Sequence, residues 1–441
     1  MVARLNAIQQ VRRVTSARFV RGVAIIAGGS ALAQAVPLAM TPVLSRLYTP
    51  ADLGTFGLYT AFLSVLSTAT TLGYAHATVS AEDDAEAAEL TLLAAVFTIP
   101  FACTSVGLLV LLVRQSWLGY GDLPIYAAPA MFLSLLLTGT YFSLRYWLLR
   151  FGAYGVISRA TVGQSVGRVL AQLCIGLVRP SWMGLVGGEV VGRGVGLTSM
   201  WQVARNGYRQ AVDGWSISRV RRTARKYRKF PLLTVPSSFL DSLGAMLPVP
   251  LVAAVFGVAA AGQYSLAVQS LLLPLSLVSA SVADVFHNRI VERARYGPAA
   301  ARRFFFQVAF ALLTVGAAPI TIVAFWGDRL IPFVLGSSWN LAGQLAATVA
   351  PRLLSQLLVS PLSRVVLVYQ RQELKLIYDV LSPVTIGVVF FVAREQHWAV
   401  LQTIRVLTWL QVGLHGLYLA LLLKIVSQPL SRRGGGELTS A

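Results

Sequence analysis

The chain has 441 residues, of which 56% are hydrophobic and only 12% are charged, and its mean hydropathy is +0.67. Soluble globular proteins carry about 25% charged residues, so this composition excludes that class and indicates a protein that crosses a membrane many times. The net charge of +20 would suggest a nucleic-acid partner in a soluble protein. Here basic cytoplasmic loops and attraction to anionic membrane lipids account for it, so we expect no nucleic-acid partner.

About a dozen apolar runs follow one another along the chain, each near the ~20 residues that cross a ~30 Å hydrocarbon core. A basic arm, residues 1–21, precedes the first run. That run is long and continues to Arg46, so it predicts a retained helix rather than a signal peptide. We therefore expect an all-α membrane protein. The predicted helices span residues 22–45, 54–80, 90–113, 124–148, 154–178, 182–204, 233–256, 263–287, 304–326, 341–369, 375–393 and 398–424.

Lys and Arg lie mainly on alternate loops between these helices. Outside the spans, 25 of them fall on one side and five on the other, and loop 205–232 alone holds nine. Because basic loops stay in the cytoplasm, we expect both termini there, with a basic linker at 205–232 and a tail at 425–441. Loop 81–89, on the same side, has five carboxylates and no base. The sequence alone assigns this acidic loop no role.

Two short loops repeat one pattern, P-x5-[YF]-x2-A-x2-G-x-[FY]-x-L, at a constant offset of 208 residues. The pairs are Pro42 with Pro250, Tyr48 with Phe256, Ala51 with Ala259, Gly54 with Gly262, Phe56 with Tyr264 and Leu58 with Leu266. Six helices separate the copies, so both halves have the same orientation. We expect two six-helix lobes, 22–204 and 233–424, related by a parallel pseudo-two-fold repeat, with a central cavity and substrate site between them.

Three stretches carry a resemblance to a known family. They are Leu44-Ser45-Arg46-Leu47-Tyr48-Thr49-Pro50-Ala51-Asp52-Leu53-Gly54, then Tyr227-Arg228-Lys229-Phe230-Pro231 with Pro236-Ser237-Ser238-Phe239-Leu240, Leu247-Pro248-Val249 and Ala261-Gly262-Gln263-Tyr264, and finally Phe333-Val334-Leu335-Gly336 with Trp339, Ala342-Gly343 and Ser360-Pro361-Leu362. The chain resembles bacterial polysaccharide flippases, the Wzx-type members of the multidrug/oligosaccharidyl-lipid/polysaccharide exporter superfamily.

The resemblance implies a flippase of the bacterial inner membrane. Its substrate would be an undecaprenyl-pyrophosphate-linked oligosaccharide, moved from the cytoplasmic to the periplasmic leaflet for O-antigen (lipopolysaccharide) or exopolysaccharide biosynthesis. The expected partners are this lipid-linked oligosaccharide, membrane lipids and other polysaccharide-assembly membrane proteins. The sequence does not identify the sugar.

Charged groups at membrane depth are costly and are functional candidates by default. Arg145, Arg159, Arg364, Asp284 and Asp379 lie near predicted helix ends, where the membrane interface explains them. The deeper charges are Arg168, Glu189, Arg193, Asp241, Arg352 and Arg405, the last being the weakest candidate.

Arg168 shares one helical face with Thr161, Ser165 and Gln172, which predicts a polar stripe turned to a cavity or to the bundle interior. Glu189 and Arg193, at i and i+4, are equally consistent with a self-neutralising pair and with a cavity role. Arg352 could pair with Asp241.

These charges suggest how an anionic substrate could cross. Arg stays protonated and offers bidentate hydrogen bonds to phosphate, so Arg168, Arg193 and Arg352, with Arg405, are candidate pyrophosphate ligands during alternating access. The sequence has no Walker A pattern, so we expect no ATP hydrolysis and no cofactor. Asp241 or Glu189 could instead exchange a proton or bind Na⁺.

Cys103 and Cys174 lie in apolar runs and are expected to be buried free thiols. The four histidines show no ligand spacing, so we predict no metal site. Two other functions stay open. A membrane glycan polymerase or ligase would need a reactive site on substantial outer loops, which are short here, and a multidrug exporter would need an aromatic and acidic pocket. A structural scaffold would not account for the repeat.

Overall fold

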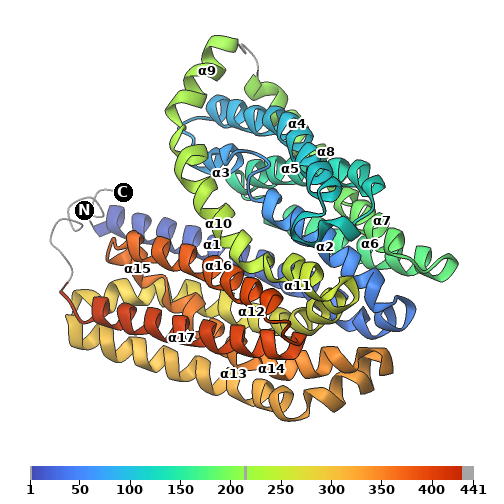
Figure 1. Ribbon diagram of the computed structural model, residues 1–441. Helices are drawn as coiled ribbons and strands as arrows, with labels where there is room; N and C mark the ends of the chain where they lie inside the picture. The colour runs from blue at the N-terminus through green and yellow to red at the C-terminus, as the bar shows by residue number, and fades with distance from the viewer. Residues whose placement is uncertain (1, 213–215, 430–441) are drawn as a thin grey trace. The chain divides into compact units, whose positions relative to one another are not determined.

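The computed structural model describes residues 2–212 and 216–429, and this part of the chain is helical, with no strand (Figure 1). The expected all-α fold is therefore confirmed. Helices are the natural outcome for these apolar runs, because in hydrocarbon each backbone N–H and C=O must be bonded within its own segment. Nine helical regions of the described residues are long and apolar enough to cross a membrane.

The first half of the chain contains α1 (Val2–Leu47), α2 (Pro50–Ser67), α3 (Tyr74–Ala77), η1 (Thr78–Ser80), α4 (Asp84–Arg114), η2 (Trp117–Asp122), η3 (Ile125–Ala127), α5 (Ala128–Arg150), α6 (Tyr154–Val178), α7 (Trp182–Gly194) and α8 (Leu197–Val212). The second half contains α9 (Ile217–Lys226), η4 (Phe230–Thr234), α10 (Val235–Met246), α11 (Pro248–Phe256), α12 (Val258–Arg295), α13 (Pro298–Leu335), η5 (Ser337–Trp339), α14 (Asn340–Leu362), α15 (Val365–Val368), α16 (Gln372–Glu395) and α17 (Val400–Val426).

Four predicted helices are divided in the structure. The helix over 233–256 becomes α10 and α11 and the helix over 341–369 becomes α14 and α15, joined in both cases through right-handed helical residues. The other two are broken by a change of backbone conformation. The helix expected over 54–80 ends at Ser67 and resumes as α3 only after Gly73, whose φ is 75°. The helix expected over 182–204 is interrupted at Val195, which is extended, and at Gly196, with φ of 85°. Both single-helix predictions are wrong, because hydropathy does not register a change in backbone direction within a run of mostly apolar residues.

Several helices are longer than predicted. The basic arm is helical as the first part of α1, and most of loop 288–303 belongs to α12 and α13. The linker 205–232 is largely helical too, through the end of α8, α9 and a π-helical turn, η4. Residues 213–215 of this linker, and the tail from residue 430 with its Arg432 and Arg433, lie outside the described residues.

Both cysteines differ from expectation. Cys103 and Cys174 are free, as predicted, but their side chains are exposed rather than buried. In a helix that crosses a membrane, an apolar neighbourhood in the sequence fits a lipid-facing position as well as a core position. This explains the error.

Contacts divide the chain into two compact units. Unit 1 comprises Met1–Tyr48, Phe62–Ser116 and Leu123–Ser242, and unit 2 comprises Thr49–Ala61, Trp117–Asp122 and Leu243–Ala441. Unit 1 has a core that includes Trp147 and Met200. A core of unit 2 includes Phe286. The lobes 22–204 and 233–424 stay a prediction.

The repeated loops meet inside unit 2. A Cβ placed on Gly54 would overlap the carbonyl oxygen of Val258, and one placed on Gly262 would overlap the carbonyl oxygen of Pro50. Pro50 and Val258 are themselves 208 residues apart, as are Gly57 and Ser265, which also contact one another. The contact is therefore reciprocal, as a local two-fold relation between equivalent segments requires. It supports the repeat found in the sequence.

The acidic loop acquires a partner in unit 1. Glu89 accepts hydrogen bonds from Arg219 and Thr223 of α9, at 2.9 and 2.6 Å. Lys226, one turn further along α9, contacts Glu86 at 2.6 Å and Glu82 at 2.9 Å. Hydrogen bonds to Glu86 and then Glu82 raise the pKa of the Lys226 ammonium, so it stays charged. The carboxylates that the sequence left unexplained therefore fix α9 against the start of α4.

Candidate functional site

The charges predicted on the fifth and sixth helices come together at one pocket of unit 1. This pocket, which we call the arginine pocket, has a volume of about 330 Å³. It is lined by residues of α1, α6 and α7. They are Ser30, Ala33, Gln34, Thr161, Gln164, Ser165, Arg168, Glu189, Gly192 and Arg193.

Close helix packing builds the pocket. A Cβ on Gly192 would lie 2.5 Å from Cβ of Arg168, and one on Gly188 would overlap the Gln172 side chain. Small residues let membrane helices approach closely, so these glycines allow α7 to lie directly on α6. Glu189 and Arg193 lie on the same stretch of α7 and are thereby placed beside Arg168.

The polar stripe of α6 is turned inward, as its spacing predicts. Thr161, Ser165 and Arg168 line the pocket, and Ser165 donates a 2.5 Å hydrogen bond to the Ala33 carbonyl of α1. Gln172 is 4% exposed and donates to the Leu185 carbonyl of α7 at 3.1 Å. The stripe therefore serves both predicted purposes, since Thr161, Ser165 and Arg168 line a cavity and Gln172 forms a hydrogen bond inside the helix bundle.

Glu189 is the electrostatic centre of the pocket. Its side chain is 5% exposed, with one oxygen 2.8 Å from Arg193 and the other 3.4 Å from Arg168. A buried carboxylate is tolerated because two guanidiniums neutralise it. The three groups together carry a net charge of +1. The geometry thus realises both predicted roles, an internal ion pair and a cavity lining.

Arg193 has hydrogen-bonding capacity left over. One terminal nitrogen contacts Glu189 and the other donates to Thr138 of α5 at 2.8 Å, which fixes the guanidinium plane. Its Nε–H is buried and has no hydrogen-bond partner among the described residues. An unsatisfied buried donor is costly. Arg193 therefore keeps one hydrogen-bonding group without a partner among the described residues.

The structure adds four polar residues that the sequence analysis missed, and one of them, Gln164 of α6, donates to the Arg193 carbonyl at 3.2 Å. Ser30 and Gln34 lie one turn apart on α1, and Thr138 lies on α5. The i, i+4 spacing of Ser30 and Gln34 in an apolar run was a signal that could have identified them. Thr138 offered none, because its role depends on α5 packing against α7.

The remaining predicted site residues do not line this pocket. Arg352 on α14 is half-buried in unit 2 and Arg405 on α17 is exposed in the same unit, whereas Asp241 on α10 is exposed in unit 1. The Arg352–Asp241 pair and the roles of all three residues stay predictions.

Arg352 belongs to a polar network that the sequence analysis also missed. Ser355 contacts Nδ1 of His415 at 2.6 Å, and the Tyr378 hydroxyl contacts Nε2 at 2.9 Å. The Ser355 hydroxyl also contacts the backbone carbonyl of Arg352 at 2.7 Å. The sequence shows His415 only as an isolated histidine, because its partners come from α14 and α16.

The five charged residues assigned to the membrane interface differ in how exposed they are in the structure. Arg159 and Arg364 are exposed, and Arg145 is half-buried. Asp379 is 4% exposed and pairs with Lys375 at 2.6 Å, and its place at the membrane interface stays a prediction. The side chain of Asp284 lies outside what the structure describes. Among the described residues no cluster of His, Cys, Asp or Glu could hold a metal ion.

Residues 43–343, more than half of the chain, match the sequence pattern of a protein family described as "Polysaccharide biosynthesis protein". The chain belongs to this polysaccharide biosynthesis family. The matched range includes the α6 and α7 residues of the arginine pocket, from Thr161 to Arg193, but not its α1 residues. The resemblance to Wzx-type proteins seen in the sequence is thereby confirmed. No curated protein matches the sequence.

Solved structures of low sequence identity share the fold. The lipid II flippase MurJ in an inward closed conformation matches with a TM-score of 0.69 at 10% identity, over 90% of this chain and 87% of that one. A multidrug resistance MATE family transporter of the MOP superfamily, in an inward-facing conformation, matches with a TM-score of 0.61 at 15% identity, over 94% of this chain and 95% of that one. A MOP superfamily transporter from Pyrococcus furiosus matches with a TM-score of 0.60 at 13% identity, over 92% of this chain and 96% of that one. The polysaccharide biosynthesis family member described here therefore has the fold of this superfamily, and it is a multi-pass membrane protein.

Proposed function

We propose that this protein is a flippase that moves an undecaprenyl-pyrophosphate-linked oligosaccharide from the cytoplasmic to the periplasmic leaflet of the bacterial inner membrane. The family match and the fold shared with a lipid II flippase support lipid-linked glycan transport. The arginine pocket is the observation that carries the proposal. Alternating access would move the head group, and the lipid tail would stay in the bilayer.

The pocket suits a pyrophosphate for three reasons. Its charged groups sum to +1, its two arginines are 32% and 27% exposed and so reachable, and one buried Arg193 donor is free of described partners. Guanidinium and phosphate form strong bidentate hydrogen bonds. The same charge disfavours the cationic compounds expected of a multidrug exporter. Arg352 and Arg405 are further candidate ligands in unit 2.

The test is glycan export in cells that lack the gene and carry a variant copy. Arg168→Ala removes a charged donor worth about 1.5–3 kcal/mol, so roughly a 10- to 100-fold loss of export is expected at normal protein levels. Arg168→Lys keeps the charge but not the bidentate geometry and should retain part of the export. Arg159→Ala is the matched control, because Arg159 is an exposed arginine of the same helix that does not line the pocket.

The distribution of lipid-linked glycan identifies the step. The proposal expects it to accumulate in the cytoplasmic leaflet when the gene is deleted. Accumulation of unpolymerised units in the outer leaflet would support a polymerase or ligase instead. Normal export in both Arg168→Ala and Arg193→Ala would refute the pocket as the head-group site, even if the deletion result held.

Coupling to an ion gradient is a separate proposal. Asp241 or Glu189 would exchange a proton or bind Na⁺ during the transport cycle. Asp241 is the better candidate for this role, since both Glu189 oxygens are already engaged by arginines whereas Asp241 is exposed. Unchanged transport after collapse of the proton and sodium gradients would remove both candidates.

A further inference from the structure

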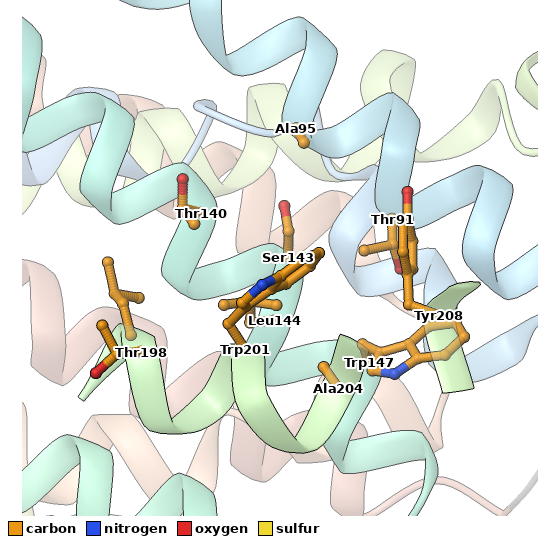
Figure 2. A pocket seen from close by; sticks show the side chains of 11 residues that line it. Thr91, Ala95, Thr140, Ser143, Leu144, Trp147, Thr198, Trp201, Ala204 and Tyr208 are labelled. Carbon is orange, nitrogen blue, oxygen red and sulfur yellow. The ribbon is translucent and has the colours of Figure 1, made fainter. Parts of the chain in front are cut away.

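A second pocket of unit 1, separate from the arginine pocket, opens between α4, α5 and α8 (Figure 2). We call it the α8 groove. Its volume is about 410 Å³, within the ~300–1,000 Å³ typical of ligand pockets, and its lining surface is almost wholly apolar. Figure 2 shows the rings of Trp201 and Tyr208 projecting from α8, with Ala204 between them and Thr91 of α4 beside Tyr208.

The groove opens onto a surface suited to hydrocarbon. Its α4 edge, at Ala95, continues into Val96 and Ile99, which are 54% and 55% exposed. On α8, Val203 is 52% exposed beside the groove. Large apolar side chains exposed along a membrane-crossing helix lie against acyl chains. Acyl chains of the surrounding lipid are therefore the molecules that can enter the groove from this surface.

Two arginines of α8 are sequence neighbours of residues that line the groove. Arg205 lies one turn beyond Trp201 on α8, and Arg209 follows Tyr208 directly. Both arginines are exposed, and neither forms an ion pair with any residue that the structure describes. Trp and Tyr mark the boundary between hydrocarbon and water in membrane proteins. The arginines therefore lie where phosphate head groups are found, at the end that we assign to the cytoplasm.

We propose that the α8 groove binds one acyl chain of an anionic phospholipid, whose phosphate is held by Arg205 and Arg209. The apolar lining selects the chain and the two guanidiniums select the negative head group. A zwitterionic lipid carries the same phosphate together with a positive ammonium group, which the arginines repel, so it gains less from them than an anionic lipid does. This site does not depend on the proposed function, because it concerns a structural or regulatory lipid and not the transported one.

The test uses bromine atoms on acyl chains, which quench nearby tryptophan fluorescence. The full chain is placed in nanodiscs of phosphatidylcholine with a minor fraction of phosphatidylglycerol, and the bromines are carried by one lipid or the other at equal mole fraction. Comparison with Trp201→Phe isolates the emission of Trp201. Each arginine near an anionic head group contributes about a fivefold preference, so brominated phosphatidylglycerol should quench Trp201 at several-fold lower mole fraction than brominated phosphatidylcholine.

Two variants separate the parts of the site. Arg205→Gln with Arg209→Gln should abolish the lipid preference, whereas the matched control Arg289→Gln with Arg295→Gln, two exposed arginines of α12, should keep it. Ala95→Phe should fill the groove and reduce quenching by both lipids.

Val96→Phe is the control for the filling variant, because Val96 is exposed next to the groove without lining it. Equal quenching by the two lipids in the unmodified protein would overturn the proposal, since any chain would then suffice. Protection of Trp201 from both lipids would also overturn it and would indicate a protein segment in the groove.

Discussion

The reciprocal glycine contact of unit 2 gives a stringent prediction. Gly54→Ala and Gly262→Ala each place a methyl group into a backbone carbonyl, of Val258 and Pro50 respectively. A flexible side chain could rotate away, but a carbonyl oxygen within a helix cannot move without shifting its helix. Overpacking costs typically 1–3 kcal/mol, and we expect both variants at the upper end, about 3 kcal/mol.

The two-fold relation makes the prediction quantitative in a second way. Because the two contacts are equivalent, the two single variants should be destabilised by the same amount, within about 0.5 kcal/mol. The double variant should cost less than the sum, because the shift that accommodates the first methyl group also makes room for the second. Thermal unfolding of the purified protein in detergent measures all three.

The control is a glycine of the same unit with open surroundings. A Cβ on Gly413 of α17 meets nothing within 4 Å, so Gly413→Ala should be neutral or slightly stabilising through higher helix propensity. If Gly54→Ala lowers stability and Gly262→Ala does not, the contact is not reciprocal and the structural argument for the repeat is refuted.

Three further predictions follow from the ion pairs and the exposed thiols. Glu189→Ala should lower the free energy of unfolding by about 1–3 kcal/mol, which is less than the ~3–5 kcal/mol for breaking a fully buried pair because both arginines are partly exposed. The double variant Glu189→Ala with Arg193→Ala should recover part of this loss, and thermal unfolding of the single and double variants measures the difference. Lys226→Glu should release α9 and speed tryptic cleavage within it, and adding Glu86→Lys should restore protection, whereas equal cleavage in all forms would contradict the docking. Cys174 should react with a lipid-soluble maleimide and resist a membrane-impermeant one, in a labelling experiment on intact membranes.

Features set by local spacing could be predicted from the sequence. The span 154–178 coincides with α6, because its apolar residues are continuous and its ends coincide with clear turns. Arg168, Glu189 and Arg193 were identified because a polar stripe and an i, i+4 pair are visible without knowledge of the fold. The repeat was detectable for the same reason, since a constant offset needs no structure.

Features set by packing between distant segments could not be predicted. The break at Gly196 arises where α8 must pass close to Ala160 of α6, and hydropathy does not register this. The partners of Glu86 and Glu89 in the acidic loop lie more than 130 residues away in sequence. His415 likewise has partners on two other helices, so one sequence shows a lone histidine and the fold shows a network.

The carboxylate in the arginine pocket has a consequence for the proposed transport step. Two guanidiniums at membrane depth would repel each other in an empty pocket, and Glu189 removes that repulsion by contacting both. A pyrophosphate entering the pocket would compete with Glu189 for the same donors. Its net affinity would therefore be lower than two free arginines would give, and its release correspondingly faster. A transporter needs this compromise, because binding that is too tight would hold the head group in the membrane.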